Sequence, residues 1–140
     1  MSKTLVLDTN ILLRAVFGVK VPAILDRYKQ EADFFTPDVC YDELKKYAFS
    51  IGAKRGLSSE HIDNTIGWLE KVVRSVGADI YDDEEADAKN RIGARDINDW
   101  PIVALALTLD SGIWTEDHDF FGTGLSTWNS RNVEIFLSSR

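Results

Sequence analysis

An alternation of short apolar runs with longer helical segments is the strongest constraint on the fold of this chain. The apolar runs predict strands at 5–7, 34–35, 78–81, 112–115 and 133–136. The segments between them predict helices at 10–17, 22–29, 37–54, 59–73, 82–92 and 101–109. Strands separated by helices are typical of a mostly parallel sheet covered on both faces. The sequence therefore predicts an α/β fold, a three-layer α/β/α sandwich with a central mostly parallel sheet.

Local signals fix several boundaries of these segments. Thr36-Pro37 predicts an N-cap followed by proline at the first helical position. Ser58 or Ser59 is predicted to cap the next helix, in which apolar residues recur at 62, 66, 69 and 73. That spacing indicates one buried helical face. The helix that starts at Pro101 is apolar on nearly every side, which predicts a central position in the fold.

Length and composition narrow the class of protein. The chain has 140 residues, which predicts one domain spanning 1–140. Its 16 Lys and Arg against 23 Asp and Glu give a net charge of -7, which argues against binding nucleic acid through bulk positive charge. The lone Cys40 excludes an internal disulfide. Since no apolar run reaches membrane-span length and the start of the sequence does not resemble a signal peptide, we expect a cytoplasmic protein without membrane contact.

Carboxylates stand at the positions where this architecture binds ligands, at the carboxyl ends of the strands. Asp8 directly follows the first predicted strand, and Asp117 closely follows the strand that ends at Thr115. Glu43 lies on the 37–54 helix at the flank of an apolar stripe, whereas Asp42 points to solvent. The stripe is expected to consist of Cys40, Leu44, Tyr47, Ala48 and Ile51. Helix capping explains Asp8 equally well, and a surface position explains Glu43.

Further acidic side chains precede the apolar helix and follow the last carboxylate. Asp96 and Asp99 lie just before Pro101, and one N-cap needs only one of them. Asp119 is better suited to stabilising a loop than to binding a ligand, and His118 is expected to be a solvated loop residue.

Taken together, these carboxylates predict a cation site. Mg²⁺ and Mn²⁺ prefer carboxylate and water oxygens, and carboxylates gathered without a cation would repel one another. Two divalent ions about 4 Å apart can activate water and stabilise the leaving oxygen in phosphodiester cleavage. The sequence has no Ser-His-Asp arrangement, phosphate-binding glycine loop or dinucleotide motif that competes with this interpretation.

Four short segments of the chain resemble the PIN domain family. They are Val6-Leu7-Asp8-Thr9-Asn10, Thr36-Pro37 with Glu43-Leu44, Asp99 with the 102–106 run, and residues 114–120. Their order and spacing span nearly the whole chain. The resemblance implies a parallel-sheet α/β/α sandwich and Mg²⁺- or Mn²⁺-dependent ribonuclease activity. Many small members of the family are VapC-like toxins of type II toxin-antitoxin pairs, which implies an antitoxin and a homodimer as partners.

The resemblance also implies roles for individual residues. The metal-binding and catalytic residues would be Asp8, Glu43, Asp99 and Asp117, holding one or two ions. The supporting residues would be Thr9, Asn10, Asp96, Thr115 and Asp119. Asp96 competes with Asp99 for the place of direct ligand, and Trp100-Pro101 replaces the smaller residues common at this point in the toxins.

The favoured hypothesis is metal-dependent hydrolysis of single-stranded RNA. Arg14, Lys46 and Arg95 are candidates to contact phosphates, and Trp128 is a candidate to stack on a base. Bound cations would attract the phosphate, so that the acidic charge no longer excludes an RNA substrate. The alternative is a catalytically silent module whose acidic edge docks a basic peptide of a partner. A phosphatase of the haloacid-dehalogenase type would need an Asp where this chain has Asn10.

Overall fold

The computed structural model describes residues 3–93 and 95–139. Its centre is a sheet of five parallel strands in the order β3-β2-β1-β4-β5. The strands are β1 (Lys3–Leu7), β2 (Ala32–Pro37), β3 (Val73–Val76), β4 (Gly112–Trp114) and β5 (Thr127–Trp128). Leu7 pairs with Trp114 across β1 and β4, so the residues that follow these two strands emerge side by side. The α/β class predicted from the sequence is confirmed.

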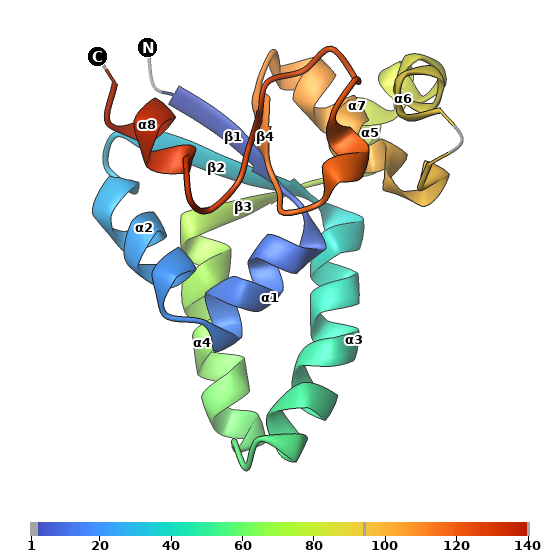
Figure 1. Ribbon diagram of the computed structural model, residues 1–140. Helices are drawn as coiled ribbons and strands as arrows, with labels where there is room; N and C mark the ends of the chain where they lie inside the picture. Colours follow the sequence, from blue (N-terminus) through green and yellow to red (C-terminus); the bar gives the residue numbers. More distant parts are fainter. Residues whose placement is uncertain (1–2, 94, 140) are drawn as a thin grey trace.

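Helices connect the strands and cover the sheet. Figure 1 shows α1, α3 and α4 on one side of the sheet and α5 to α7 on the other. The α-helices are α1 (Thr9–Phe17), α2 (Lys20–Tyr28), α3 (Asp38–Lys54), α4 (Ser59–Val72), α5 (Ala78–Tyr81), α6 (Glu85–Ile92), α7 (Trp100–Leu109) and α8 (Val133–Leu137). The short 3₁₀ helices are η1 (Asp82–Glu84), η2 (Ile97–Asp99) and η3 (His118–Phe120).

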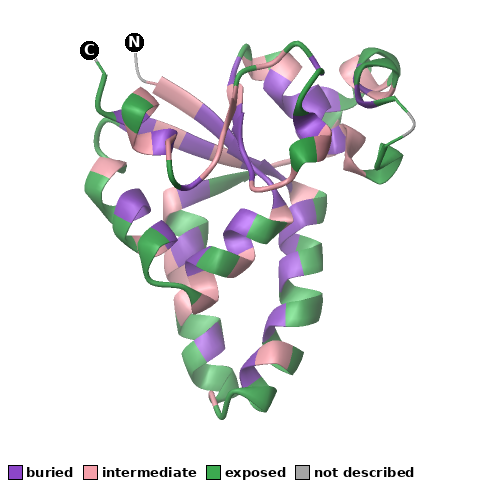
Figure 2. Ribbon diagram, viewed as in Figure 1, coloured by how far each residue is buried: buried purple, intermediate pink, exposed green. Residues whose placement is uncertain are grey.

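The core lies on both faces of the sheet, where the central strands meet α1, α3 and α4 on one side and the apolar helix α7 on the other. Leu5, Val6 and Leu7 are all inaccessible to solvent, as expected for a strand covered on both faces. In α7 the run Pro101–Ala106 is buried without a polar face, which confirms its predicted central position. Figure 2 shows the buried residues concentrated in the strands and in the helix faces turned toward them. This packing makes the carboxyl edge of the sheet a rigid support for the residues that follow β1 and β4.

Two predicted strands are helices. Residues 78–81 form α5, and the strand of this region lies upstream at Val73–Val76, paired with β2. The apolar spacing at 62, 66, 69 and 73 continues past the end of α4. The change from helix to strand at Val73 therefore leaves no mark in the sequence pattern. Residues 133–136 belong to helix α8, while the fifth strand is only two residues long and too short to show a period.

Thr36 does not cap a helix. It is the fifth residue of β2, and α3 begins at Asp38 with Pro37 at the N-cap position. The buried Thr36 hydroxyl instead donates a hydrogen bond to the carbonyl of Leu7, at 2.7 Å. This bond ties β2 to the end of β1, directly before Asp8. Ser58 is the cap of α4, as predicted: its hydroxyl accepts a hydrogen bond from the amide of His61.

None of the helices in the described residues is long and apolar enough to cross a membrane. Met1 and Ser2, which formed part of the signal-peptide argument, lie outside the described residues.

Candidate active site

Asp8 lies at the junction of β1 and α1 and makes two hydrogen bonds there. Its Oδ1 accepts from the amide of Ile11 at 3.0 Å, which makes it the N-cap of α1. Its Oδ2 accepts from the hydroxyl of Thr115, the residue that follows β4. The side chain is only 5% exposed. The capping explanation is therefore correct, and the same two bonds fix the direction in which the carboxylate faces the neighbouring pocket.

Glu43 lies on the exposed side of α3 and reaches toward α1. The hydroxyl of Thr9 donates to its Oε1 at 3.3 Å. The buried face of α3 consists of Cys40, Tyr41, Leu44, Ala48 and Gly52. Tyr47 and Ile51, which were predicted to belong to the apolar stripe, are not buried. Tyr47 is 44% exposed and lies one turn from Glu43, on the same side of the helix.

Asp99 and Asp96 occupy different environments although they are three residues apart. Asp99 stands at the N-cap position of α7, but its side chain makes no capping hydrogen bond. Asp96 accepts from the amide of Asn98 at 3.3 Å and caps η2. Asp99 lines the pocket and Asp96 does not. The structure therefore favours Asp99 over Asp96 as the residue that faces a ligand.

Asp117 is held by the loop that follows β4. Its amide donates to the hydroxyl of Thr115 at 2.9 Å, and its Oδ1 accepts from the amide of Asp119 at 2.9 Å. Thr115 thus connects Asp117 to Asp8 through one hydroxyl group. Asp119 contributes backbone contacts and does not line the pocket. Thr115 therefore contacts the carboxylate of Asp8 and the amide of Asp117, and its supporting role stays a prediction.

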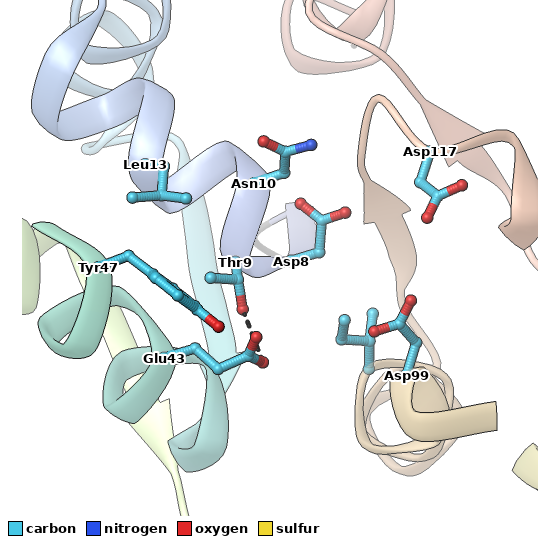
Figure 3. Close-up of a pocket in the computed structure, with 9 residues that line it drawn as sticks. Asp8, Thr9, Asn10, Leu13, Glu43, Tyr47, Asp99 and Asp117 are labelled. Carbon is cyan, nitrogen blue, oxygen red and sulfur yellow. Dashed lines mark hydrogen bonds between the residues drawn. The ribbon is translucent and has the colours of Figure 1, made fainter. Parts of the chain in front are cut away.

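The four carboxylates predicted as ligands line a single pocket of about 230 Å³. Figure 3 shows them facing this space from the end of β1, from α3, from the start of α7 and from the loop after β4. The other lining residues are Thr9, Asn10, Leu13, Tyr47 and Ile102. Sequence reasoning missed the three apolar members of this set. The positions of Leu13 and Tyr47, one helical turn beyond Thr9 and Glu43, were a signal that would have indicated them.

Burial and mutual repulsion disfavour the ionised forms of the carboxylates in this pocket. Loss of hydration raises the pKa of Asp8 to about 6, against the smaller opposing effect of its hydrogen bonds from Thr115 and Ile11. The pKa of Asp99 is raised to about 7, first by burial and then by the negative charges of Asp96, Asp8, Asp117 and Glu43. Of the described residues that line the pocket, none is Lys or Arg. The negative charge of the pocket thus lacks a basic side chain to balance it.

The donor chemistry of the pocket fits a hard divalent cation. The carboxylates, the Thr9 hydroxyl and the Asn10 carboxamide all offer oxygen atoms, which Mg²⁺ and Mn²⁺ prefer. Across the described part of the chain, however, no three His, Cys, Asp or Glu side chains are grouped closely enough to hold a metal as they stand. Mg²⁺ usually retains several waters and binds few carboxylates directly, so this spacing is compatible with a hydrated ion.

The basic residues predicted to contact RNA do not gather at this pocket. Arg14 lies on the exposed side of α1 and lines a separate apolar depression. Lys46 points over the ring of Tyr47, 5.4 Å from its centroid. Arg95 donates to the carbonyls of Asp119, at 3.0 Å, and of Phe121. The guanidinium of Arg95 is thus engaged in holding a loop.

Comparison with known proteins identifies the family. The profile described as "PIN domain" matches residues 6–138, and this chain therefore belongs to the PIN domain family. PIN domains are generally nucleases that use divalent metal ions. No curated protein matches the chain.

Solved structures share the fold at low sequence identity. A chain of the VapBC2 structure from Rickettsia felis, bound to a DNA fragment from its promoter, is 14% identical with a TM-score of 0.65. That match covers 90% of this chain and 98% of the other. A chain of VapBC-1 from nontypeable Haemophilus influenzae is 20% identical with a TM-score of 0.62, covering 91% and 98%. PAE2754 from Pyrobaculum aerophilum is 12% identical with a TM-score of 0.64, covering 99% and 91%.

Proposed function

We propose that residues 1–140 form one nuclease domain that hydrolyses single-stranded RNA internally with the help of Mg²⁺ or Mn²⁺. The observation that carries this proposal is the convergence of Asp8, Glu43, Asp99 and Asp117 on one pocket from four separate elements. A divalent cation, when bound, supplies Lewis acidity that activates water and stabilises charge on the phosphodiester. One or two ions would be held by these carboxylates.

The remaining polar residues of the pocket have positioning roles in this proposal. Thr115 donates to Asp8 and accepts from Asp117, and so it holds two carboxylates in a fixed relation. Thr9 orients Glu43 through its hydroxyl. The side chains of Asp96 and Asp119 do not line the pocket. We propose that Asp96 acts only through the turn that it caps, and Asp119 only through the backbone amide that it donates to Asp117.

The biological setting we propose is a cytoplasmic toxin of a type II toxin-antitoxin pair. The fold neighbours from Rickettsia felis and Haemophilus influenzae are VapBC structures, and a similar structure from Neisseria gonorrhoeae is FitAcB. A protein antitoxin is therefore proposed as a partner of this chain, and a homodimer is proposed by analogy with the family's toxins alone. A small reading frame beside its own, encoding a protein that co-purifies with it and inhibits cleavage, is the outcome that supports this setting.

The test of nuclease function compares two isosteric variants three residues apart. Single-stranded RNA is incubated with purified protein in Mn²⁺ or in excess EDTA. We expect cleavage only with Mn²⁺, a loss of about a hundredfold or more in Asp99→Asn, and a change within about threefold in Asp96→Asn, because Asn retains the cap. Full cleavage in EDTA, or equal losses in both variants, contradicts the proposal.

Docking of a basic peptide is the second candidate. It is favoured by the absence, within residues 3–93 and 95–139, of a ready-made metal-binding group. It is also favoured by the apolar side chains of Leu13, Tyr47 and Ile102 beside the carboxylates, which could contact the stem of an arginine or lysine. This candidate predicts peptide binding that does not depend on Mn²⁺, together with no RNA cleavage.

A further inference from the structure

A second recess lies on the other side of Asp117 and is not used by the site described above. It is formed by the loop after β4 and the turn after β5, and it has a volume of about 100 Å³. Asp117 lines both this recess and the carboxylate pocket. A volume of this size holds about three water molecules, which is room for the polar edge of one planar ring. A ligand seated here would therefore adjoin the proposed cleavage site.

Two asparagines in the recess present oriented hydrogen-bond donors. Asn129 Oδ1 accepts from the amides of Arg131 and Asn132, at 2.9 and 3.0 Å. Asn132 Oδ1 accepts from the amide of Asn129 at 2.8 Å. Because both oxygens are occupied by backbone N–H groups, the orientation of each carboxamide is fixed. Their NH₂ groups make no side-chain hydrogen bond within the described residues, and they remain available to a ligand.

An exposed aromatic ring stands beside these donors. Phe121 is 50% exposed, whereas the preceding Phe120 is fully buried in the core. The imidazole of His118 packs edge-on against Phe121, with 5.3 Å between the ring centroids. The backbone of Phe121 is fixed, since its carbonyl accepts from Arg95 and its amide donates to the carbonyl of His118 at 3.0 Å. The fold thus keeps the apolar ring of Phe121 exposed to solvent beside a polar recess.

We propose that this recess binds a nucleobase of the RNA, with its ring on Phe121 and its keto oxygen at the NH₂ groups of Asn129 and Asn132. This inference rests on the proposed nuclease function and adds a base preference to it. Stacking on an aromatic ring serves any base, but fixed NH₂ donors favour the keto edge of uracil or guanine over the same edge of adenine. Arg131 lines the same recess and is exposed, which places a cation within reach of a flanking phosphate.

Binding of short oligonucleotides in EDTA tests the recess without relying on cleavage. Fluorescein-labelled penta-uridylate and penta-adenylate are titrated with the protein and followed by anisotropy. We expect penta-uridylate to bind more tightly than penta-adenylate. Phe121→Ala should weaken both by about tenfold or more, because it removes a stacking surface. Asn132→Asp retains the oxygen that accepts from Asn129 but replaces one of the two NH₂ donors, and it should reduce the preference for uracil.

Two control variants separate a local effect from a general one. Val19→Ala truncates an apolar side chain that is 86% exposed at the start of α2. Asn64→Asp adds the same charge at an exposed position of α4. Both should bind the two oligonucleotides as the unmodified protein does. Equal binding by Phe121→Ala and the unmodified protein, or an undiminished uracil preference in Asn132→Asp, overturns the inference.

Cleavage-site mapping distinguishes a failure of this inference from a failure of the proposed function. On an RNA of mixed sequence with Mn²⁺, we expect the unmodified protein to cut with a keto base at one fixed position beside the broken bond. That bias should weaken in Asn132→Asp while the need for Mn²⁺ remains. Cleavage with no such bias, or no binding of either oligonucleotide, overturns the base recess alone. Absence of cleavage under any metal overturns the nuclease proposal.

Discussion

Two effects act in opposite directions on the charged form of Asp8, namely its hydrogen bonds and its burial. Asp8 caps α1 and bonds Thr115, yet its burial raises its pKa to about 6. An acid whose pKa is higher in the folded than in the unfolded state binds protons more tightly when folded. The folded protein is therefore most stabilised by this group at low pH, and the advantage is lost as pH rises from about 4 to about 6. A bound cation would remove this penalty at neutral pH.

Because the raised pKa of Asp8 destabilises the folded protein at neutral pH, removing the charge should stabilise it. In EDTA at neutral pH, Asp8→Asn should increase the free energy of unfolding by about 1–3 kcal/mol, since about two pKa units correspond to that range. The gain should shrink toward pH 4, where Asp8 is protonated in the folded state and only partly ionised in the unfolded state. Urea unfolding of both proteins between pH 4 and 7.5 measures it, with Asp42→Asn as an exposed control. A difference that does not change with pH contradicts the burial argument.

The role of Thr36 was misassigned from the sequence, which predicted that it caps a helix. Its hydroxyl is buried and donates to the carbonyl of Leu7, the last residue of β1. Thr36→Val keeps the shape but leaves that carbonyl without this partner, and we expect a loss of about 1–3 kcal/mol in stability. Thr65→Val, which removes a hydroxyl on the exposed side of α4 that also donates to a carbonyl, should cost less than about 0.5 kcal/mol. Urea unfolding compares them, and equal losses contradict the account.

At the scale of elements, arginines of the α6 region fasten the loop that carries Asp117. Arg91 donates to the carbonyl of Thr123 at 2.8 Å, and Arg95 donates to those of Asp119 and Phe121. In Figure 1 this loop follows β4 on the side of the sheet occupied by α6 and α7. The segment that precedes Asp99 in the sequence is thereby bonded to the loop that bears Asp117.

Arg95→Met tests whether the hydrogen bonds of Arg95 hold this loop in place. Amide hydrogen exchange at residues 118–123 should accelerate by about tenfold, because the carbonyl contacts that hold the loop are lost. Arg74→Met, at the exposed ion pair with Asp33, should leave this loop unchanged. If Arg95 instead contacted RNA directly, exchange in the free protein would not change, and only the salt dependence of RNA binding would fall.

Local patterns predicted most elements but not their boundaries with one another. The strand before Asp8 and the apolar helix α7 were predictable because burial leaves a clear pattern in the sequence. The end of α4 at Val72 was not, because Val73 completes the helical apolar face and also begins β3. Residues 78–81 were mistaken for a strand because four residues cannot distinguish the two periods.

At the scale of the whole molecule, parallel topology explains why the site was predictable at all. Asp8 and Thr115 lie 107 positions apart in sequence, and the register of β1 with β4 brings them into hydrogen-bond contact. The rule that ligands bind at the carboxyl ends of strands therefore indicated the carboxylates. It gave no information on Leu13, Tyr47 or Ile102, whose place in the pocket depends on how α1, α3 and α7 pack.

The central claim is that the four-carboxylate pocket binds a divalent cation, and calorimetric titration with Mn²⁺ tests it most directly. Glu43 and Asp42 are adjacent exposed acids of α3, and only Glu43 lines the pocket. We predict that the unmodified protein and Asp42→Asn bind Mn²⁺ with equal affinity, and that Glu43→Gln binds it about tenfold or more weakly. No measurable Mn²⁺ binding by the unmodified protein, or equal affinity in all three, would contradict the account.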